Sequence, residues 1–267
     1  MDIIMQVQDF DDGDSLLGFA GLMLRGFPAE ALLGLYVFED GSVGAAYPGP
    51  APDLTTNHKN AAVAQGAAQR IAAGVATSGT GGFVFDTGIP YATGSFTAFG
   101  VFANQRAIGS SEVTQQMWGP VPFLTGGSSA GVALQDRFRS DYHILRMIAK
   151  GGWSGLSGDR DGADYFDTPT NDYRAWAVIW NAATGTMQLR FRAPAGRTAT
   201  FAAEDMAKIA SGMPNVLGNH GFAIKADGAA GAVGLAGIFG AALTINEVDN
   251  VLSNARAIVA ARGVTVS

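Results

Sequence analysis

The stretch from Tyr173 to Arg192 constrains the fold of this chain most, because its apolar residues alternate on both sides of a glycine-containing turn. One face of the two arms carries large apolar residues, namely Trp176, Val178, Trp180, Met187, Leu189 and Phe191. The opposite face of the second arm carries Gln188, Arg190 and Arg192. A period of two around a short turn predicts an antiparallel hairpin with one face against a core.

Other segments have the composition of strands, and they are Leu32–Glu39, Gly82–Ile89, Ser95–Ala103, Arg139–Ala149, His220–Ala226 and Ala232–Phe239. Ser95–Ala103 has apolar residues on both faces, which indicates a central strand that is covered on both sides. Residues 42–80 are rich in Gly, Pro, Ala and Asn. For that stretch we expect long loops with one weak strand.

The end of the chain has the pattern of an amphipathic helix. Thr244 and Glu247 are spaced as a capping box, apolar residues then recur at helical spacing, and Gly263 follows as a stop signal. Because long helices do not alternate with the strands, a parallel α/β fold is disfavoured. The sequence therefore predicts an all-β fold, an antiparallel jelly-roll β-sandwich with a short N-terminal arm and a C-terminal amphipathic helix.

The length of 267 residues suits one large β domain. We expect the sandwich and its helix to occupy residues 32–267 and an arm to occupy residues 1–31. After Asp14 the arm has an apolar, helix-like stretch. This stretch either packs on the core of its own chain or forms a contact for attachment and homo-oligomerisation.

Charge and residue usage exclude several classes of function. The chain has 23 acidic and 17 basic residues, for a net charge of −6, so a basic face for nucleic acid is not expected. It has no cysteine, which excludes disulfides and thiolate chemistry. Its first residues are acidic, unlike a signal peptide, and the apolar run 16–24 is shorter than the ~20 residues of a membrane span. We therefore expect neither a signal peptide nor membrane insertion.

Four stretches, in this order, resemble the concanavalin A-like lectin/glucanase superfamily, and within it the laminin-G-like jelly rolls. They are Gly34–Gly41, Phe85–Phe102, Tyr173–Phe191 and Ala236–Arg256. In the last, a strand runs into Leu-Thr-x-x-Glu-Val, a pattern that recurs in this group. The resemblance covers roughly residues 32 to 262 and implies the jelly-roll sandwich.

The glucanase branch of this superfamily uses paired carboxylates, typically as Glu-x-Asp-x-x-Glu on one strand, and the chain has no such pattern. It also lacks His-Glu-x-x-His and phosphate-binding loop motifs. No catalytic residue is predicted, and the expected protein is not an enzyme. The alternatives are a carbohydrate-active enzyme or its accessory carbohydrate-binding module, and a purely structural domain without a ligand.

Sugars are bound by aromatic faces together with amide, acidic and guanidinium groups. The segments with that mixture predict a carbohydrate site with Trp118, Trp153, Arg160, Tyr165 and Asn171. For both tryptophans a half-buried packing role is the competing interpretation. Trp176 and Trp180 are assigned to the core because they alternate within the hairpin.

An acidic, glycine-containing segment supplies the residue types of a calcium site, namely Asp159, Asp161, Asp164 and Asp167. The segment lacks the spacing and the distal glutamate of an EF-hand loop. An exposed turn stabilised by aspartate side chains is the alternative interpretation. Calcium is the one cofactor that the sequence suggests.

Jelly rolls of this kind without signal peptides are common in bacteriophage virions, as fibres, spikes and surface decorations. The resemblance therefore implies a non-enzymatic, surface-exposed virion component that is made in the host cytoplasm. Its expected partners are other virion proteins, further copies of itself and a host-surface glycan.

Overall fold

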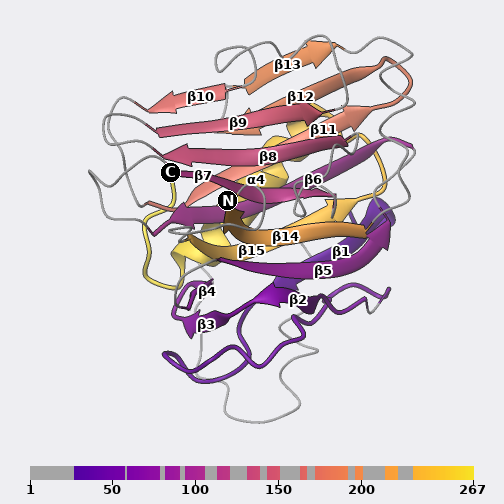
Figure 1. Cartoon of the computed structure of the whole chain (residues 1–267). Coiled ribbons are helices and arrows are strands. Elements are labelled where there is room, and N and C mark those ends of the chain that lie inside the picture. Colours follow the sequence, from indigo (N-terminus) through magenta and orange to yellow (C-terminus); the bar gives the residue numbers. More distant parts are fainter. Residues whose placement is uncertain are drawn as a thin grey trace.

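The computed structural model describes residues 27–57, 59–78, 82–90, 94–105, 113–120, 131–138, 143–150, 163–166, 172–191, 196–200, 214–221 and 231–267. Within these ranges the strands form two sheets whose neighbouring strands are all antiparallel, and one long helix follows the last strand (Figure 1). The predicted all-β sandwich is thereby confirmed.

Sheet I contains both arms of the predicted hairpin. Its order is β13 (Gly196–Thr200), β12 (Thr186–Phe191), β11 (Arg174–Asn181), β6 (Phe96–Asn104), β15 (Gly231–Phe239), β4 (Gly74–Thr77) and β3 (Ala68–Ile71). A short 3-10 turn at Ala29–Ala31 leads into β1 (Leu32–Val37), which pairs with β15. In the hairpin Trp176 lies opposite Phe191 and Asn181 opposite Thr186.

Sheet II is built from the remaining strands. Its order is β10 (Ala163–Phe166), β9 (His143–Lys150), β8 (Gly131–Phe138), β7 (Val113–Pro120), β14 (Pro214–Gly221), β5 (Phe83–Pro90) and β2 (Ala62–Gly66). The strands of both sheets run across the view in Figure 1.

Aromatic side chains fill the space between the two sheets. The ring centroids of Phe96 in β6 and Trp118 in β7 are 5.4 Å apart, and those of Phe38 and Phe85 are 5.1 Å apart. Trp176 and Trp180 also lie in this core and are almost fully buried. These contacts across the sandwich explain why the hairpin keeps one face entirely apolar.

The other face of sheet I is covered by helix α4 (Ile245–Ala260), which lies behind the strands in Figure 1. Strand β6 contributes Phe96 and Phe102 to the core between the sheets and Phe99 and Val101 to the core under the helix. The prediction that this strand is covered on both sides is confirmed.

The capping box of α4 is present as predicted. The Thr244 hydroxyl accepts a hydrogen bond from the Glu247 N–H at 3.3 Å, and the Glu247 carboxylate accepts one from the Thr244 N–H at 2.7 Å. Gly263 has a φ of +83°, in the left-handed region that glycine tolerates best after a helix.

The prediction for residues 42–80 was wrong, because three strands, β2, β3 and β4, lie there (Figure 1). These strands are short and consist mostly of small residues, so they lack the apolar alternation that marks a strand in sequence. Backbone pairing holds them instead. A neighbouring loop covers β3 through the Tyr47 N–H and the Ala68 carbonyl at 2.8 Å.

Two other predictions fall partly outside the described residues. Strand β14 begins at Pro214 and ends at Gly221, so it shares only two residues with the predicted strand His220–Ala226, whose remaining residues are not described. Of the arm, residues 1–26 are not described, and its boundary at residue 31 stays a prediction. Phe27 is buried and stacks on Phe99 at 5.4 Å, which fixes the approach to β1.

Within the described ranges, no helix has both the length and the apolar character needed to span a membrane.

Candidate functional site: a hollow beside the β11–β12 turn

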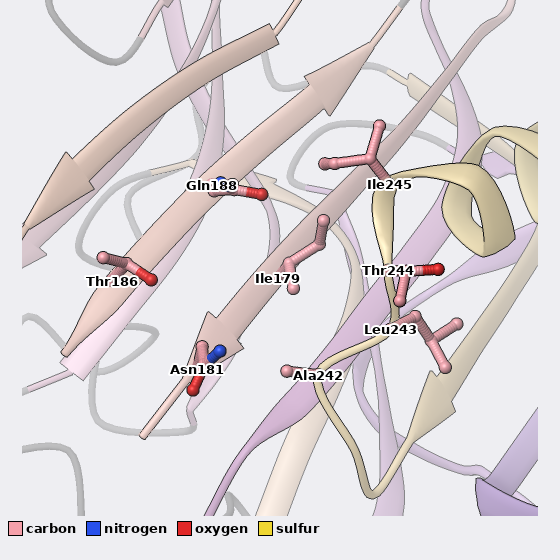
Figure 2. A pocket seen from close by; sticks show the side chains of 8 residues that line it. All are labelled: Ile179, Asn181, Thr186, Gln188, Ala242, Leu243, Thr244 and Ile245. Carbon is pink, nitrogen blue, oxygen red and sulfur yellow. The ribbon is translucent and has the colours of Figure 1, made fainter. Parts of the chain in front are cut away.

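A hollow of ≈ 210 Å³, open to solvent on one side, lies on the outer face of sheet I beside the first turn of α4 (Figure 2). Its lining comes from the turn end of the hairpin and from the segment that leads into the helix, namely Ile179, Asn181, Thr186, Gln188, Ala242, Leu243, Thr244 and Ile245. Two regions distant in sequence therefore build one site.

The hairpin turn is held by its own side chains. The Asn181 carboxamide oxygen accepts hydrogen bonds from the N–H groups of Ala183 at 3.0 Å and Thr184 at 3.3 Å. The hydroxyl groups of Thr184 and Thr186 are 2.7 Å apart. Gly185 completes the turn with a φ of +64°. This network fixes the polar rim of the hollow.

The opposite wall is positioned by a buried hydroxyl group in β6. Thr97 is fully buried, and its Oγ1 donates to the Ala241 carbonyl at 2.9 Å while accepting from the Leu243 N–H at 3.0 Å. These bonds hold the connection from β15 to α4 against the sheet. Leu243 is thereby buried at the wall, and the cap residue Thr244 stays exposed.

Two charged groups of α4 lie close to the hollow, and each is held by a specific partner. The Arg190 guanidinium binds Asp249 through Nε–Oδ1 at 2.9 Å and Nη2–Oδ2 at 2.8 Å, and this hydrogen bonding raises the pKa of Arg190. Hydrogen bonds from the Thr244 side chain and backbone lower the pKa of Glu247. Glu247 therefore remains ionised at neutral pH, next to the wall of the hollow.

The lining residues suit binding better than chemistry. Amide and hydroxyl groups on Asn181, Thr186 and Gln188 stand beside aliphatic surface, a combination that can hold a polar ligand with an apolar part. None of the described lining residues is acidic, basic or a histidine, so they supply neither a general acid nor a general base. Within the described ranges no cluster of three or more His, Asp or Glu residues is placed to hold a metal ion.

The predicted carbohydrate residues are not brought together among the described residues. Trp118 is fully buried in the core against Phe96, so its ring has no exposed face on which a sugar could stack. Tyr165 lies in β10 opposite Ile144. Trp153, Arg160 and Asn171 lie outside the described residues, and their assignment stays a prediction.

The predicted calcium ligands fall in the same part of the chain. Asp164 lies in β10, opposite Leu145 in β9. Asp159, Asp161 and Asp167 lie outside the described residues. Both interpretations of this segment, the calcium site and the exposed turn, remain open.

Sequence reasoning missed the hollow, although it placed Gln188 and Arg190 correctly on the polar face of the hairpin. The polar face of a hairpin is usually exposed to water. The alternation of residues along the two strands does not indicate which other segment packs against that face. The one available signal was the capping box, which marks where a helix begins immediately after the last strand. The distance from this helix start to the hairpin turn depends on tertiary packing.

No protein-family model matches this chain, and no curated protein matches it in sequence. Solved structures of botulinum neurotoxin binding domains do share its fold. The serotype D binding domain matches with a TM-score of 0.53 and 11% identity, over 84% of this chain and 51% of that one. The binding domain of neurotoxin DC in complex with SialylT matches with a TM-score of 0.54 and 10% identity, over 85% and 52%.

The same neurotoxin DC binding domain in complex with rat synaptotagmin II also matches, with a TM-score of 0.54 and 11% identity. This chain spans about half the length of these solved domains. At such low identity the likeness establishes the sandwich fold that they share.

Proposed function

We propose that this chain is a non-enzymatic carbohydrate-binding β-sandwich and that the hollow beside the β11–β12 turn is its sugar site. The observation that carries the proposal is the lining itself. Side-chain amides and hydroxyls stand at the rim, aliphatic side chains stand behind them, and the site is open to solvent. Sugars present hydroxyl groups and C–H faces, and such a surface matches both.

The fold supports this proposal by analogy. One of the solved domains that share the sandwich is a neurotoxin binding domain in complex with SialylT, and another is in complex with a protein, synaptotagmin. A sandwich of this type can thus carry recognition sites. The analogy concerns only the fold. The assignment of a sugar ligand to this chain rests on the lining of the hollow.

The biological setting that we propose is the surface of a bacteriophage particle, where the chain serves as a fibre, spike or decoration component. The resemblance of four stretches to concanavalin A-like jelly rolls supports this setting. In it, residues 1–31 contact other virion proteins or further copies of the chain, and the hollow faces a host-surface glycan. Antibodies against the chain should label intact particles in electron micrographs, and recovery of the chain only from host lysate would count against this setting.

A binding measurement tests the sugar site. The intact chain is screened on a glycan array, and the affinity for the best glycan is then measured by calorimetry. Gln188→Ala should weaken binding by about tenfold, because one hydrogen bond to the ligand is lost. Gln69→Ala is the matched control. Gln69 is also a half-buried glutamine of sheet I, but it lies in β3 at the other edge, and its replacement should leave the affinity unchanged.

The alternative of a carbohydrate-active enzyme is tested with the same ligand. The bound glycan is incubated with the protein, and release of reducing sugar is measured over time. Binding without release supports the proposal. Release that disappears when one carboxylate is replaced by its amide would establish an enzyme instead.

A further inference from the structure

The character of the hollow narrows the kind of sugar that it fits, and this step rests on the proposed function. In Figure 2 the polar groups of Asn181, Thr186 and Gln188 gather on the hairpin side of the hollow. Ile179 lies between them and the segment that carries Leu243 and Ile245. A ligand that fits this arrangement has hydrogen-bonding groups on one side and an apolar group on the other.

The charges around the hollow disfavour an acidic ligand. Arg190, the cation of the adjoining ion pair, donates two hydrogen bonds to Asp249, and its side chain is only 12% exposed. Glu247 is negative and remains so at neutral pH, because its hydrogen bonds with Thr244 lower its pKa. The chain as a whole carries a net charge of −6, which repels anions at long range.

A carboxylated sugar would therefore enter the hollow without a counter-charge from the described lining. Removing a carboxylate from water is costly unless a cation or several donors replace the water. A neutral sugar carries no such cost. Its apolar substituent, such as the methyl of an acetamido or 6-deoxy group, gains from contact with the aliphatic wall.

We propose that the hollow selects neutral sugars that carry a methyl-bearing substituent and discriminates against sialylated and other carboxylated sugars. Gln188 and Asn181 supply the polar contacts, and Ile179, Leu243 and Ile245 form the apolar wall. Because Asn181 also holds the hairpin turn, Gln188 is the better position at which to test the polar side.

The experiment uses the intact chain and matched pairs of probes. The affinities for N-acetylglucosamine, glucose and N-acetylneuraminic acid, and for a neutral oligosaccharide and its sialylated form, are measured by calorimetry or ligand-observed NMR. The neutral oligosaccharide should bind about tenfold or more tightly than its sialylated form, and the acetylated amino sugar more tightly than glucose, which is also neutral but has no acetamido methyl group. In saturation-transfer NMR, the protons of the acetyl methyl group should show the strongest signal of the bound sugar.

Two variants locate these preferences in the hollow. Gln188→Ala should lower the affinity for all neutral probes, whereas Ile245→Ala should reduce mainly the preference for the acetylated sugar. Ile245 is only partly buried at the first position of α4, where alanine is well tolerated, so this variant retains the fold. The Gln69→Ala control should change neither value.

The outcomes separate the two proposals. If the intact chain binds no sugar, the proposed function is overturned. If it binds the sialylated form as tightly as the neutral one and Gln188→Ala abolishes this binding, the function stands and the selectivity inference fails. Sugar binding that Gln188→Ala leaves unchanged overturns both the inference and the placement of the sugar site in the hollow, because the sugar then occupies another site, whereas carbohydrate binding by the chain stands.

Discussion

In strand β11 of sheet I, the largest side chains pack toward sheet II and the smallest toward α4. Toward sheet II it presents Trp176 and Trp180, and toward α4 it presents Ala175 and Ala177. All four side chains are almost fully buried. Large rings span the gap between two sheets, whereas small side chains let a helix approach the sheet closely.

This contrast between the two faces of sheet I indicates where a ligand site can form in this fold. Between the sheets, the described side chains of β5, β6, β7 and β11 pack closely in one apolar core. Among the described residues, α4 covers much of the outer face of sheet I, and the helix begins at Ile245. Beyond that point the hairpin end is left partly uncovered, and the hollow lies there. The site thus follows from the start of the helix.

The variant with the largest expected effect on the free energy of unfolding is Trp118→Ala, which tests the core between the two sheets. Trp118 is fully buried and packs on Phe96 across the gap between the sheets, so its removal leaves a cavity that rigid strands cannot close. Cavity formation of this size should lower the free energy of unfolding by about 3–5 kcal/mol. Urea denaturation followed by tryptophan fluorescence and circular dichroism measures the change. A loss below about 1 kcal/mol would show that the inter-sheet core does not hold the sandwich together.

The close approach of the helix is tested at Gly234 in β15. A Cβ atom at this position would lie 2.9 Å from both methyl groups of Val259 and 3.1 Å from the Ala73 carbonyl oxygen. Gly234→Ala should therefore lower the free energy of unfolding by about 1–3 kcal/mol, because the helix must shift outward. The change is measured by urea denaturation.

Val259→Ala provides the matched test of that mechanism. It removes the methyl groups that the new Cβ would meet, so the double variant should be less destabilised than the sum of the two single variants, by on the order of 1 kcal/mol. Additive effects would mean that the stability lost in Gly234→Ala comes from the backbone or from the contact with Ala73. The contact with helix α4 would then not determine which side chain fits at this position.

The same contrast explains how much could be predicted from the sequence. The inward face of the hairpin, the doubly covered strand β6 and the cap of α4 were predicted correctly, because each depends on neighbours close in sequence. Strands β2, β3 and β4 were missed because their small residues show no alternation. The hollow was missed because it forms where the segment before α4 meets the hairpin turn, and no local pattern encodes that contact.

The partner of Arg190 is the sharpest example. Alternation placed this residue on the outer face of the hairpin and indicated no partner for it. The structure places it against Asp249 of α4, 59 positions later in the chain, with its side chain only 12% exposed. Neither residue is unusual in its own segment, so only the packed structure reveals that this ion pair anchors the first turns of the helix beside the hollow.

The smallest expected effect comes from this ion pair. Arg190→Ala and Asp249→Ala should each lower the free energy of unfolding, and the double-mutant cycle should give a coupling of about 1 kcal/mol, since the pair is bidentate and only partly exposed. Arg190→Lys keeps the charge but loses the paired geometry, so it should recover only part of this coupling. Urea denaturation at low and high salt gives both values. A coupling near zero would mean that aliphatic packing alone seats α4 on sheet I, and the two faces would then differ only in the size of their apolar side chains.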